Sequence, residues 1–572
     1  MTGPVADAAA RALAAIAAAD RPEVWISRFS DEEILAAASS LDARLAAGHV
    51  LPLAGLTFAV KDNIDVRGLP TTAACPAYAY QPADHAPAVV ALVEAGALCM
   101  GKTNLDQFAT GLVGTRSPYG AVRNAIDPTR ISGGSSSGSA VAVALDMVDF
   151  SLGTDTAGSG RVPAALNGIV GFKATYGLVS TTGVIPACRS FDCVTVFARD
   201  VDRAESVMAI LTANVAHDQR SFPADAPLGP PDHPVVAHPA AALLADLPLS
   251  WVTLYQEALA QLEAQGCQLV EIDLEPFLAA GRLLYQGAFV AERYHAVGRW
   301  IDAHPGEADP TVGAIIGAAA SVSAADFAAD LDRLVAARAL VEAEWQRVGA
   351  DSLVLPTTTG HPTLEEVAAD PIGVNTRLGQ FTTFLNLLDQ CAVAVPAGRA
   401  AGLPFGVSCI GPAFSDRVQA DVARLVEGSG PARLPQLSPP ALSIAVVGAH
   451  LAGQPLHHQL SDRGARLVRV TSTAPSYRLY ALDTVPPKPG LVRVADGGAS
   501  ITLEVWELSP AGFGDFVAHV PAPMAIGTVA LQDGSSVSGF LCEPFALDGA
   551  LDITDYGGWV AYLRSGATAS VK

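Results

Sequence analysis

Short apolar segments alternate with helical patterns along the first two thirds of the chain. The runs LTFAV (56–60), DFSLG (149–153) and DSLVLP (351–356) have the length of buried strands, and helical periodicity fills the stretches between them. This alternation predicts an α/β domain. Residues 1–20 predict an amphipathic helix, because charged residues interrupt an alanine-rich run that lacks the basic start of a signal peptide.

The C-terminal part of the chain has a different pattern. ITLEVWEL (501–508) predicts a strand, and TVALQDGSSVSGFL (528–541) predicts two strands joined at an Asp-Gly turn. This part is therefore expected to be β-rich.

Changes in composition mark the domain borders. GSGPARLPQLSPP (428–440) packs four prolines and two glycines between apolar regions, which predicts a linker. A second proline-rich stretch, residues 216–240, predicts a surface excursion from the first domain. We therefore expect domains at residues 1–430 and 442–572, joined by a linker at 431–441.

Composition and charge narrow the classes of partner. Half of the residues are apolar and 16% are charged, which is typical of a folded chain. The net charge of −22 provides no basic field for nucleic acid. The most apolar later stretch, residues 312–325, is shorter than a membrane span of roughly 20 residues. We expect a cytoplasmic protein that binds neither nucleic acid nor membrane, with its eight cysteines reduced.

Three segments concentrate potential reactive groups: AVKDN (59–63), SGGSSSGSAVAVA (132–144) and SLGTDTAGSGRVP (151–163). In the second, serines precede an apolar helix expected to begin near Ala140, so hydroxyls and free N–H groups meet at a helix N-terminus. Its Gly-x-Ser-x-Gly spacing is also that of a hydrolase nucleophile elbow, which would make Ser136 the nucleophile. That interpretation requires a strand directly before the elbow, whereas the preceding NAIDPTRIS predicts a loop.

These segments resemble the amidase signature family, with the resemblance running from about Leu53 to about Gly411. The block from Ser132 to Phe172 is specific for that family. The family has a Ser-cisSer-Lys triad in a central mixed sheet flanked by helices, and its matching positions here are Lys61, Ser135 and Ser159. The interval of 24 positions from Ser135 to Ser159 matches the family's interval and selects Ser135 among three adjacent serines.

The chemistry of this triad sets physical requirements. A lysine acts as base only when neutral, and lowering its pKa from about 10.4 to roughly 7–8 costs about 4 kcal/mol, so Lys61 should be enclosed. Ser135, after a cis Gly134–Ser135 peptide, relays the proton from Ser159. The expected oxyanion donors are the N–H groups of Thr156, Ala157, Gly158 and Ser159, and Asp155 and Arg161 are expected to brace their loop.

Other stretches resemble one subgroup of the family, the allophanate hydrolases. They are ATGLVGTRSPYGAVRNAIDP (109–128), PACRSFDCVTVFARDV (186–201) and YQGAFVAERYHAVG (285–298). Tyr285 and Arg293 lie eight residues apart, about two helical turns, so both can face one pocket. The subgroup uses this pair to hold its substrate, a small, anionic, urea-like molecule, and a guanidinium matches its carboxylate with two hydrogen bonds.

The C-terminal region resembles the appended domain of the same subgroup. VVGAHLAGQPLHHQL (446–460) contains His450, which matches a family histidine and is our site candidate for the loss of carbon dioxide from N-carboxycarbamate. A capped loop histidine is the alternative. His457 and His458 lack the cysteine or carboxylate spacing that would complete a metal site, so no metal is assigned.

The resemblance implies allophanate hydrolysis to two ammonia and two carbon dioxide, without metal or organic cofactor. It also implies association with urea carboxylase or with enzymes of cyanurate breakdown, and we expect a homodimer. Alternatives are hydrolysis of another small amide, a transamidating glutamine amidase subunit, and a C-terminal domain that serves assembly and not catalysis.

Overall fold

The chain folds into two compact units. A computed structural model describes residues 3–213, 216–429 and 440–566. The first unit comprises residues 1–221 and 235–430, and the second comprises residues 222–234 and 431–572. The linker expected at 431–441 lies, up to residue 439, outside the described residues. Residues 222–234, from the middle of the proline-rich excursion, are thus grouped with the second unit, although the sequence assigned them to the first domain.

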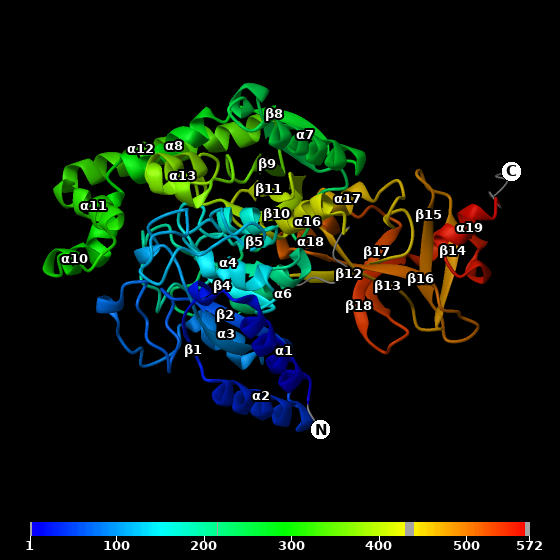
Figure 1. The fold of residues 1–572 in the computed structure, drawn as a ribbon. Helices are drawn as coiled ribbons and strands as arrows, with labels where there is room; N and C mark the ends of the chain where they lie inside the picture. The colour runs from blue at the N-terminus through cyan, green and yellow to red at the C-terminus, as the bar shows by residue number, and fades with distance from the viewer. Residues whose placement is uncertain (1–2, 214–215, 430–439, 567–572) are drawn as a thin grey trace. The chain divides into compact units, whose positions relative to one another are not determined.

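A mixed sheet of eleven strands forms the centre of the first unit, as expected from the sequence (Figure 1). Pairing is parallel among β3, β2 and β4 and among β9, β7 and β8, and antiparallel elsewhere. The strand order is β1 (Trp25–Arg28), β3 (Leu98–Thr103), β2 (Thr57–Lys61), β4 (Phe150–Asp155), β6 (Cys193–Ala198), β5 (Val170–Lys173), β10 (Cys391–Ala400), β11 (Leu403–Gly411), β9 (Ser352–Pro356), β7 (Val235–Pro239) and β8 (Gln268–Ile272).

Helices cover this sheet. The N-terminal amphipathic helix is confirmed as α1 (Pro4–Ala19), which packs with α2 (Asp31–Ala46). The remaining helices of the unit are α3 (Pro87–Glu94), α4 (Ser137–Ala144), α5 (Val162–Asn167), α6 (Val201–Ala213), α7 (Leu249–Ala264), α8 (Glu275–Gln286), α9 (Val290–Arg293), a π-helix (Tyr294–Gly298), α10 (Arg299–Ala303), α11 (Pro310–Ala318), α12 (Ala324–Val348), α13 (Leu364–Ala369), α14 (Gly373–Leu378), α15 (Phe384–Leu387) and α16 (Asp416–Glu427).

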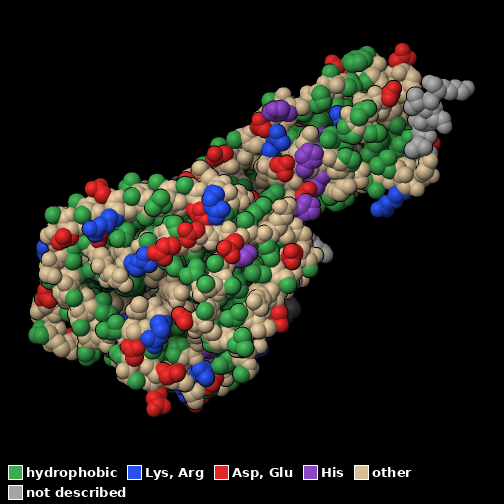
Figure 2. Space-filling model, turned by 90° about the horizontal axis from the view of Figure 1, so that it is seen from above, with side chains coloured by type: hydrophobic (Ala, Val, Ile, Leu, Met, Phe, Trp, Pro, Cys, Tyr) green, Lys and Arg blue, Asp and Glu red, His purple; other side chains and the backbone are tan. Residues whose placement is uncertain are grey.

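The surface carries scattered charge. On the face shown in Figure 2, basic side chains are isolated among acidic ones, in keeping with the net charge of −22. No single helix in the described ranges is both long and apolar enough to cross a membrane; residues 310–321 and 324–348 meet that standard only together, as a pair bent by 98°.

The strands expected from apolar runs are confirmed as β2, β4 and β9. The helix expected near Ala140 begins three residues earlier, at Ser137. Its first turn consists of small residues because it packs tightly: a Cβ on Gly138 would lie 2.4 Å from the carbonyl oxygen of Val24. Small side chains therefore let this helix begin directly against the residues that precede the sheet.

The second unit contains two sheets around one core. Apolar side chains of both sheets, such as Leu479 and Leu503, belong to a single buried cluster. The five-stranded sheet has the order β13 (Arg466–Ser472), β16 (Thr502–Leu508), β12 (Leu442–Val446), β18 (Ser536–Cys542) and β17 (Met524–Ala530). The second sheet has the order β15 (Lys488–Arg493), β14 (Tyr477–Leu482) and β19 (Leu551–Asp552), and the helices are α17 (His458–Ser461), α18 (Pro510–Ala518) and α19 (Trp559–Arg564). The expected C-terminal strand and hairpin are thus present as β16 and as β17 with β18.

Residues 222–234 are bonded into this second unit. The N–H of Leu228 donates to the carbonyl of Gly464 at 2.9 Å, and the N–H of Ala511 donates to the carbonyl of Ala224 at 3.1 Å. Asp232 lies 2.9 Å from Nε2 of His457. A segment that precedes β7 in the sequence therefore completes the C-terminal unit.

We expect a fragment of residues 440–566 to melt at a lower temperature than the same fragment fused through a flexible linker to residues 222–234. Each restored hydrogen bond contributes about 1 kcal/mol, which shifts the Tm of a domain this size by roughly 4 °C. Leu228→Pro in the fusion is the control, because it removes the N–H that bonds Gly464. Thermal unfolding followed by circular dichroism measures the difference, and equal Tm values for all three proteins would contradict the expectation.

Candidate active site

The three residues expected to form the triad lie in one hydrogen-bonded row. Lys61 Nζ lies 2.8 Å from Ser135 Oγ, and Ser135 Oγ lies 3.0 Å from Ser159 Oγ. Lys61 ends β2, Ser135 precedes α4, and Ser159 lies between β4 and α5. The Gly134–Ser135 peptide is cis, as the resemblance implied. The row provides a continuous path for a proton from Ser159 to Lys61.

Ser136, the alternative nucleophile, does not join this row. Its hydroxyl donates to the carbonyl of Thr154 at 3.1 Å, and its side chain is buried. It directly precedes α4, and the residues ahead of it form a loop and not the strand that a nucleophile elbow requires. Ser136 therefore ties α4 to β4.

Asp106 holds the loop that presents Ser135. Its carboxylate accepts the N–H groups of Val113, Gly114 and Arg116 at 2.9–3.1 Å, and its own N–H donates to the carbonyl of Ser135 at 3.1 Å. A Cβ on Gly134 would lie 2.2 Å from Asp106 Oδ2, so only glycine permits this approach.

Burial controls the protonation of Lys61. Its side chain is fully enclosed, and its hydrogen-bond partners are the hydroxyls of Ser135 and Thr154, the latter at 2.7 Å. Desolvation lowers the pKa of Lys61 to about 7, and the positive charge of Arg293 contributes in the same direction. The negative charges of three buried aspartates, Asp106, Asp155 and Asp192, act in the opposite direction. A fraction of the lysine is thus neutral near neutral pH, which is the form that can act as a base.

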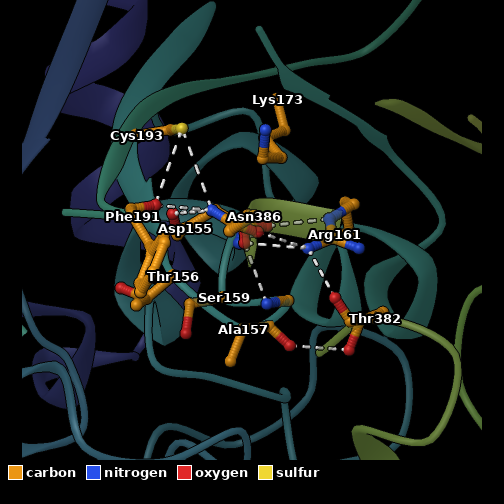
Figure 3. A network of polar contacts seen from close by, with 12 residues as sticks. Asp155, Thr156, Ala157, Ser159, Arg161, Lys173, Phe191, Cys193, Thr382 and Asn386 are labelled. Atoms are coloured by element: carbon orange, nitrogen blue, oxygen red, sulfur yellow. Dashed lines mark hydrogen bonds and ion pairs between the residues drawn. The ribbon is translucent and has the colours of Figure 1, made fainter. Parts of the chain in front are cut away.

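Asp155 braces the loop that carries Ser159 (Figure 3). Its carboxylate accepts the N–H groups of Gly158 and Gly160 at 2.8 and 2.9 Å, and it pairs with both Nε and Nη2 of Arg161 at 2.9 Å. Both side chains are fully buried. Arg161 also reaches the carbonyl of Thr382 at 3.1 Å, so the pair connects the loop to the residues before α15.

The oxyanion donors differ from the expectation at Gly158. Because its N–H donates to Asp155, it is occupied and does not point to a free position beside Ser159. Within the described residues, the N–H groups of Thr156, Ala157 and Ser159 donate to no protein acceptor. These three remain the predicted oxyanion donors, and Gly158 instead allows the loop to turn, with φ of +128°.

Tyr285 and Arg293 meet, although not on one helix as expected. Helix α8 ends at Gln286, and a separate helix, α9, carries Arg293. Arg293 Nη2 lies 3.3 Å from the Tyr285 hydroxyl, and Nη1 lies 3.0 Å from Thr110 Oγ1. Arg293 is 2% exposed, and no carboxylate within the described residues forms an ion pair with its guanidinium, so this arginine is not part of a surface ion pair.

Sequence reasoning missed two residues that contact this row or its loop. Thr154 accepts a hydrogen bond from Lys61, and Asp192 accepts one from the hydroxyl of Thr156 and others from the N–H groups of Ala187 and Cys188. Burial raises the pKa of Asp192 to about 6. Only the position of Asp192 directly before an apolar strand, β6, marked it as unusual.

His450 lies in a separate cavity of about 210 Å³ within the second unit. Its ring stacks on Phe540 at 4.9 Å, and Nε2 lies 3.0 Å from Oε1 of Gln459. Burial lowers the pKa of His450, which favours the neutral imidazole. Lys488 also lines the cavity. His450 therefore lies in a turn and lines the cavity, and its role as a site residue stays a prediction beside the alternative of a capped loop histidine.

His457 and His458 do not gather as metal ligands. His457 pairs with Asp232, and Nδ1 of His458 lies 3.1 Å from the carbonyl of Pro455. In the part of the chain that the structure describes, no three His, Cys, Asp or Glu side chains group as metal ligands would.

Comparison with known proteins agrees with this geometry. The amidase family model matches residues 8–418, and the allophanate hydrolase C-terminal domain model matches residues 442–564. Urea amidolyases of Lachancea kluyveri and Saccharomyces cerevisiae are 42% and 43% identical, each over 94% of this chain and 31% of the relative, so the chain spans about a third of these relatives. The structure of Kluyveromyces lactis allophanate hydrolase has a TM-score of 0.86 and 40% identity, covering 98% of this chain and 97% of that one.

The pKa of Lys61 predicts the pH dependence of amide hydrolysis. Below about pH 7 the lysine is protonated and cannot accept a proton, so kcat/KM for a neutral small amide should rise with pH through about 7 and then level. Arg293→Met should move this rise to higher pH, because the guanidinium charge lowers the pKa of Lys61. The exposed Arg299→Met is the control and should leave the midpoint in place. A midpoint unaffected by Arg293→Met would contradict the assignment of Lys61 as the base.

Proposed function

The chain belongs to the amidase family, and from that premise we propose that it hydrolyses allophanate, releasing ammonia and N-carboxycarbamate. The observation that carries this proposal is the buried guanidinium of Arg293 beside the nucleophile. Arg293 contacts Thr110, and the hydroxyl of Ser159 lies 3.4 Å from the carbonyl of the next residue, Gly111. A buried cation without a protein carboxylate fits a substrate that brings its own.

Acylation begins at Ser159. Its oxygen attacks the terminal amide carbon of allophanate while its proton passes to Ser135, which gives its own proton to neutral Lys61. The N–H groups of Ala157, Thr156 and Ser159 are placed to stabilise the developing oxyanion. The proton returns from Lys61 through Ser135 to the leaving nitrogen, the C–N bond breaks, and ammonia departs.

Hydrolysis of the acyl-enzyme uses the same row in reverse. A water molecule loses a proton to the Ser135–Lys61 pair as it attacks the acyl carbon, and that proton then returns to the oxygen of Ser159. N-carboxycarbamate is released. The substrate's carboxylate stays on Arg293 and Tyr285 through both steps, which fixes the reacting carbon near Ser159.

We assign the second stage to the C-terminal unit. N-carboxycarbamate carries two carboxylates, and its decarboxylation to carbon dioxide and carbamate, followed by carbamate breakdown, gives the second ammonia and the second carbon dioxide. The cavity supports this assignment with a buried neutral imidazole at His450 and a cation at Lys488. Service as an assembly module is the alternative, and the stoichiometry of the His450 variant below separates the two.

The relatives support a place in nitrogen metabolism. Because the urea amidolyases are about three times as long as this chain, we propose that the chain works with a partner that makes allophanate, of the urea carboxylase class. Enzymes of cyanurate breakdown are the alternative source of the same substrate. The allophanate hydrolysed would be identical in both routes.

Substrate preference tests the proposal. Ammonia release should be fastest with allophanate, slower with malonamate, and slowest with neutral biuret, glutamine or a fatty amide, with Ser159→Ala as the blank. At a pH above the Lys61 titration, where the base is neutral in both proteins, Arg293→Ala should lower kcat/KM for allophanate by about 100-fold, since the lost charge-assisted hydrogen bonds contribute about 3 kcal/mol, and should affect biuret little. A wild-type preference for any other amide in this panel would overturn the substrate assignment.

The His450 cavity can be tested by stoichiometry. In His450→Ala, the first ammonia should appear at the wild-type rate, and carbon dioxide and the second ammonia should lag while N-carboxycarbamate accumulates. The exposed His458→Ala is the control and should show no lag. Rapid-quench measurement of ammonia and carbon dioxide distinguishes the stages; simultaneous release of both products from His450→Ala would favour the assembly role.

A further inference from the structure

The α-helical backbone is interrupted between Tyr285 and Arg293, the two residues proposed to hold the substrate. Helix α8 ends at Gln286, and α9 begins at Val290. In one continuous helix the N–H of Ala288 would bond to the carbonyl of Leu284. The N–H of Ala288 bonds instead to a side chain from a distant helix. A residue outside the segment 285–293 therefore influences the distance between Tyr285 and Arg293.

That side chain is Asp330 of α12. Its Oδ2 accepts the N–H of Ala288 at 2.5 Å, and its Oδ1 pairs with Arg333 at 2.6 Å. The Asp330 side chain is 3% exposed, whereas that of Arg333 is 69% exposed. A carboxylate buried to this degree with a backbone N–H as partner holds that N–H firmly, because either group left alone would be costly.

Gly287 makes this contact possible. A Cβ at this position would lie 2.4 Å from Asp330 Oδ2 and 2.6 Å from the carbonyl oxygen of Leu283. Any larger residue would push the carboxylate off the N–H of Ala288. Gly287 therefore leaves the space that the Asp330 carboxylate needs to accept the N–H of Ala288.

The same face of α12 touches the rest of the site. Phe327 and Leu334, one turn before and one turn after Asp330, belong to the apolar cluster that includes Tyr285 and Ala157. The ring of Phe327 also meets that of Phe289 edge to face at 5.5 Å. Helix α12 thus packs against the segment that carries Tyr285, through an apolar cluster that also includes Ala157 of the oxyanion loop.

We propose that Asp330 is a positioning residue that sets the distance between the Tyr285 hydroxyl and the Arg293 guanidinium, and thereby the specificity for a carboxylate. The inference rests on the proposed allophanate activity. Asp330 touches no substrate and acts through the chain break at Gly287–Ala288. Its effect is expected on the binding of anionic substrates and not on the chemical step at Ser159.

The experiment compares allophanate with neutral biuret in the full chain. Asp330→Ala should raise KM for allophanate about tenfold, the equivalent of one buried hydrogen bond, with kcat and the biuret parameters changed less than about threefold. Asp330→Asn keeps an oxygen acceptor and should restore most of the affinity. Gly287→Ala should likewise raise KM for allophanate without a comparable change in kcat or in the biuret parameters. The matched control is Asp332→Asn, a substitution of an exposed neighbour on α12.

A double variant separates positioning from general destabilisation. If Asp330 acts through Arg293, then Arg293→Ala with Asp330→Ala should lose no more allophanate kcat/KM than Arg293→Ala alone. Additive losses, or an equal fall of kcat for both substrates, would overturn the proposal. Melting temperatures of all variants identify any loss caused by unfolding, and Asp330→Asn then provides the folded comparison.

The two levels of inference fail differently. If the wild type shows no preference for allophanate over biuret, the proposed function is wrong whatever Asp330 does. If the wild type prefers allophanate and Arg293→Ala removes the preference while Asp330→Ala keeps it, only the role of Asp330 is wrong.

Discussion

The site depends on a lysine that is enclosed without a carboxylate to pair with it. Lys61, Lys102 and Lys173 are all fully buried, but their partners differ. Lys102 pairs with Asp62 at 3.0 Å, and Lys173 donates to two carbonyls, whereas Lys61 donates only to hydroxyls. A hydroxyl can donate to a neutral amine as well as accept from a charged one, so Lys61 alone has partners suited to both protonation states.

The loops around this lysine introduce a conflict. The side chains of Asp106 and Asp155 hold the glycine loops, and their negative charges favour protonated Lys61. Both carboxylates accept hydrogen bonds from backbone N–H groups, and that of Asp155 also pairs with Arg161, which limits their effect on Lys61. Removing one member of the buried Asp155–Arg161 pair would cost about 3–5 kcal/mol. Arg293 acts in the opposite sense on Lys61. The cation that we propose binds the substrate's carboxylate therefore also helps to keep Lys61 neutral.

Local motifs predicted the parts of the site that depend on local sequence. The triad, the cis peptide and the bracing by Asp155 and Arg161 followed from motif residues and their resemblance, and the apolar runs correctly located β2, β4 and β9. The errors have non-local causes. Asp155 occupies the N–H of Gly158, and Asp330, more than forty residues downstream, accepts the N–H of Ala288 where the helix expected to carry Tyr285 and Arg293 is interrupted. Residues 222–234 likewise join a unit whose other residues begin two hundred positions later.

In both units burial lowers the pKa of a basic side chain. In the first, burial removes the charge of an amine whose ordinary pKa lies far above neutrality; in the second, burial lowers the pKa of an imidazole that is already close to it. Each base has a cation nearby, Arg293 in one unit and Lys488 in the other. A cation disfavours protonation of the base and attracts a carboxylate. Sites built this way suit substrates that carry negative charge and react at a neighbouring carbon, which is what the proposed function requires of allophanate in the first unit and of N-carboxycarbamate in the second.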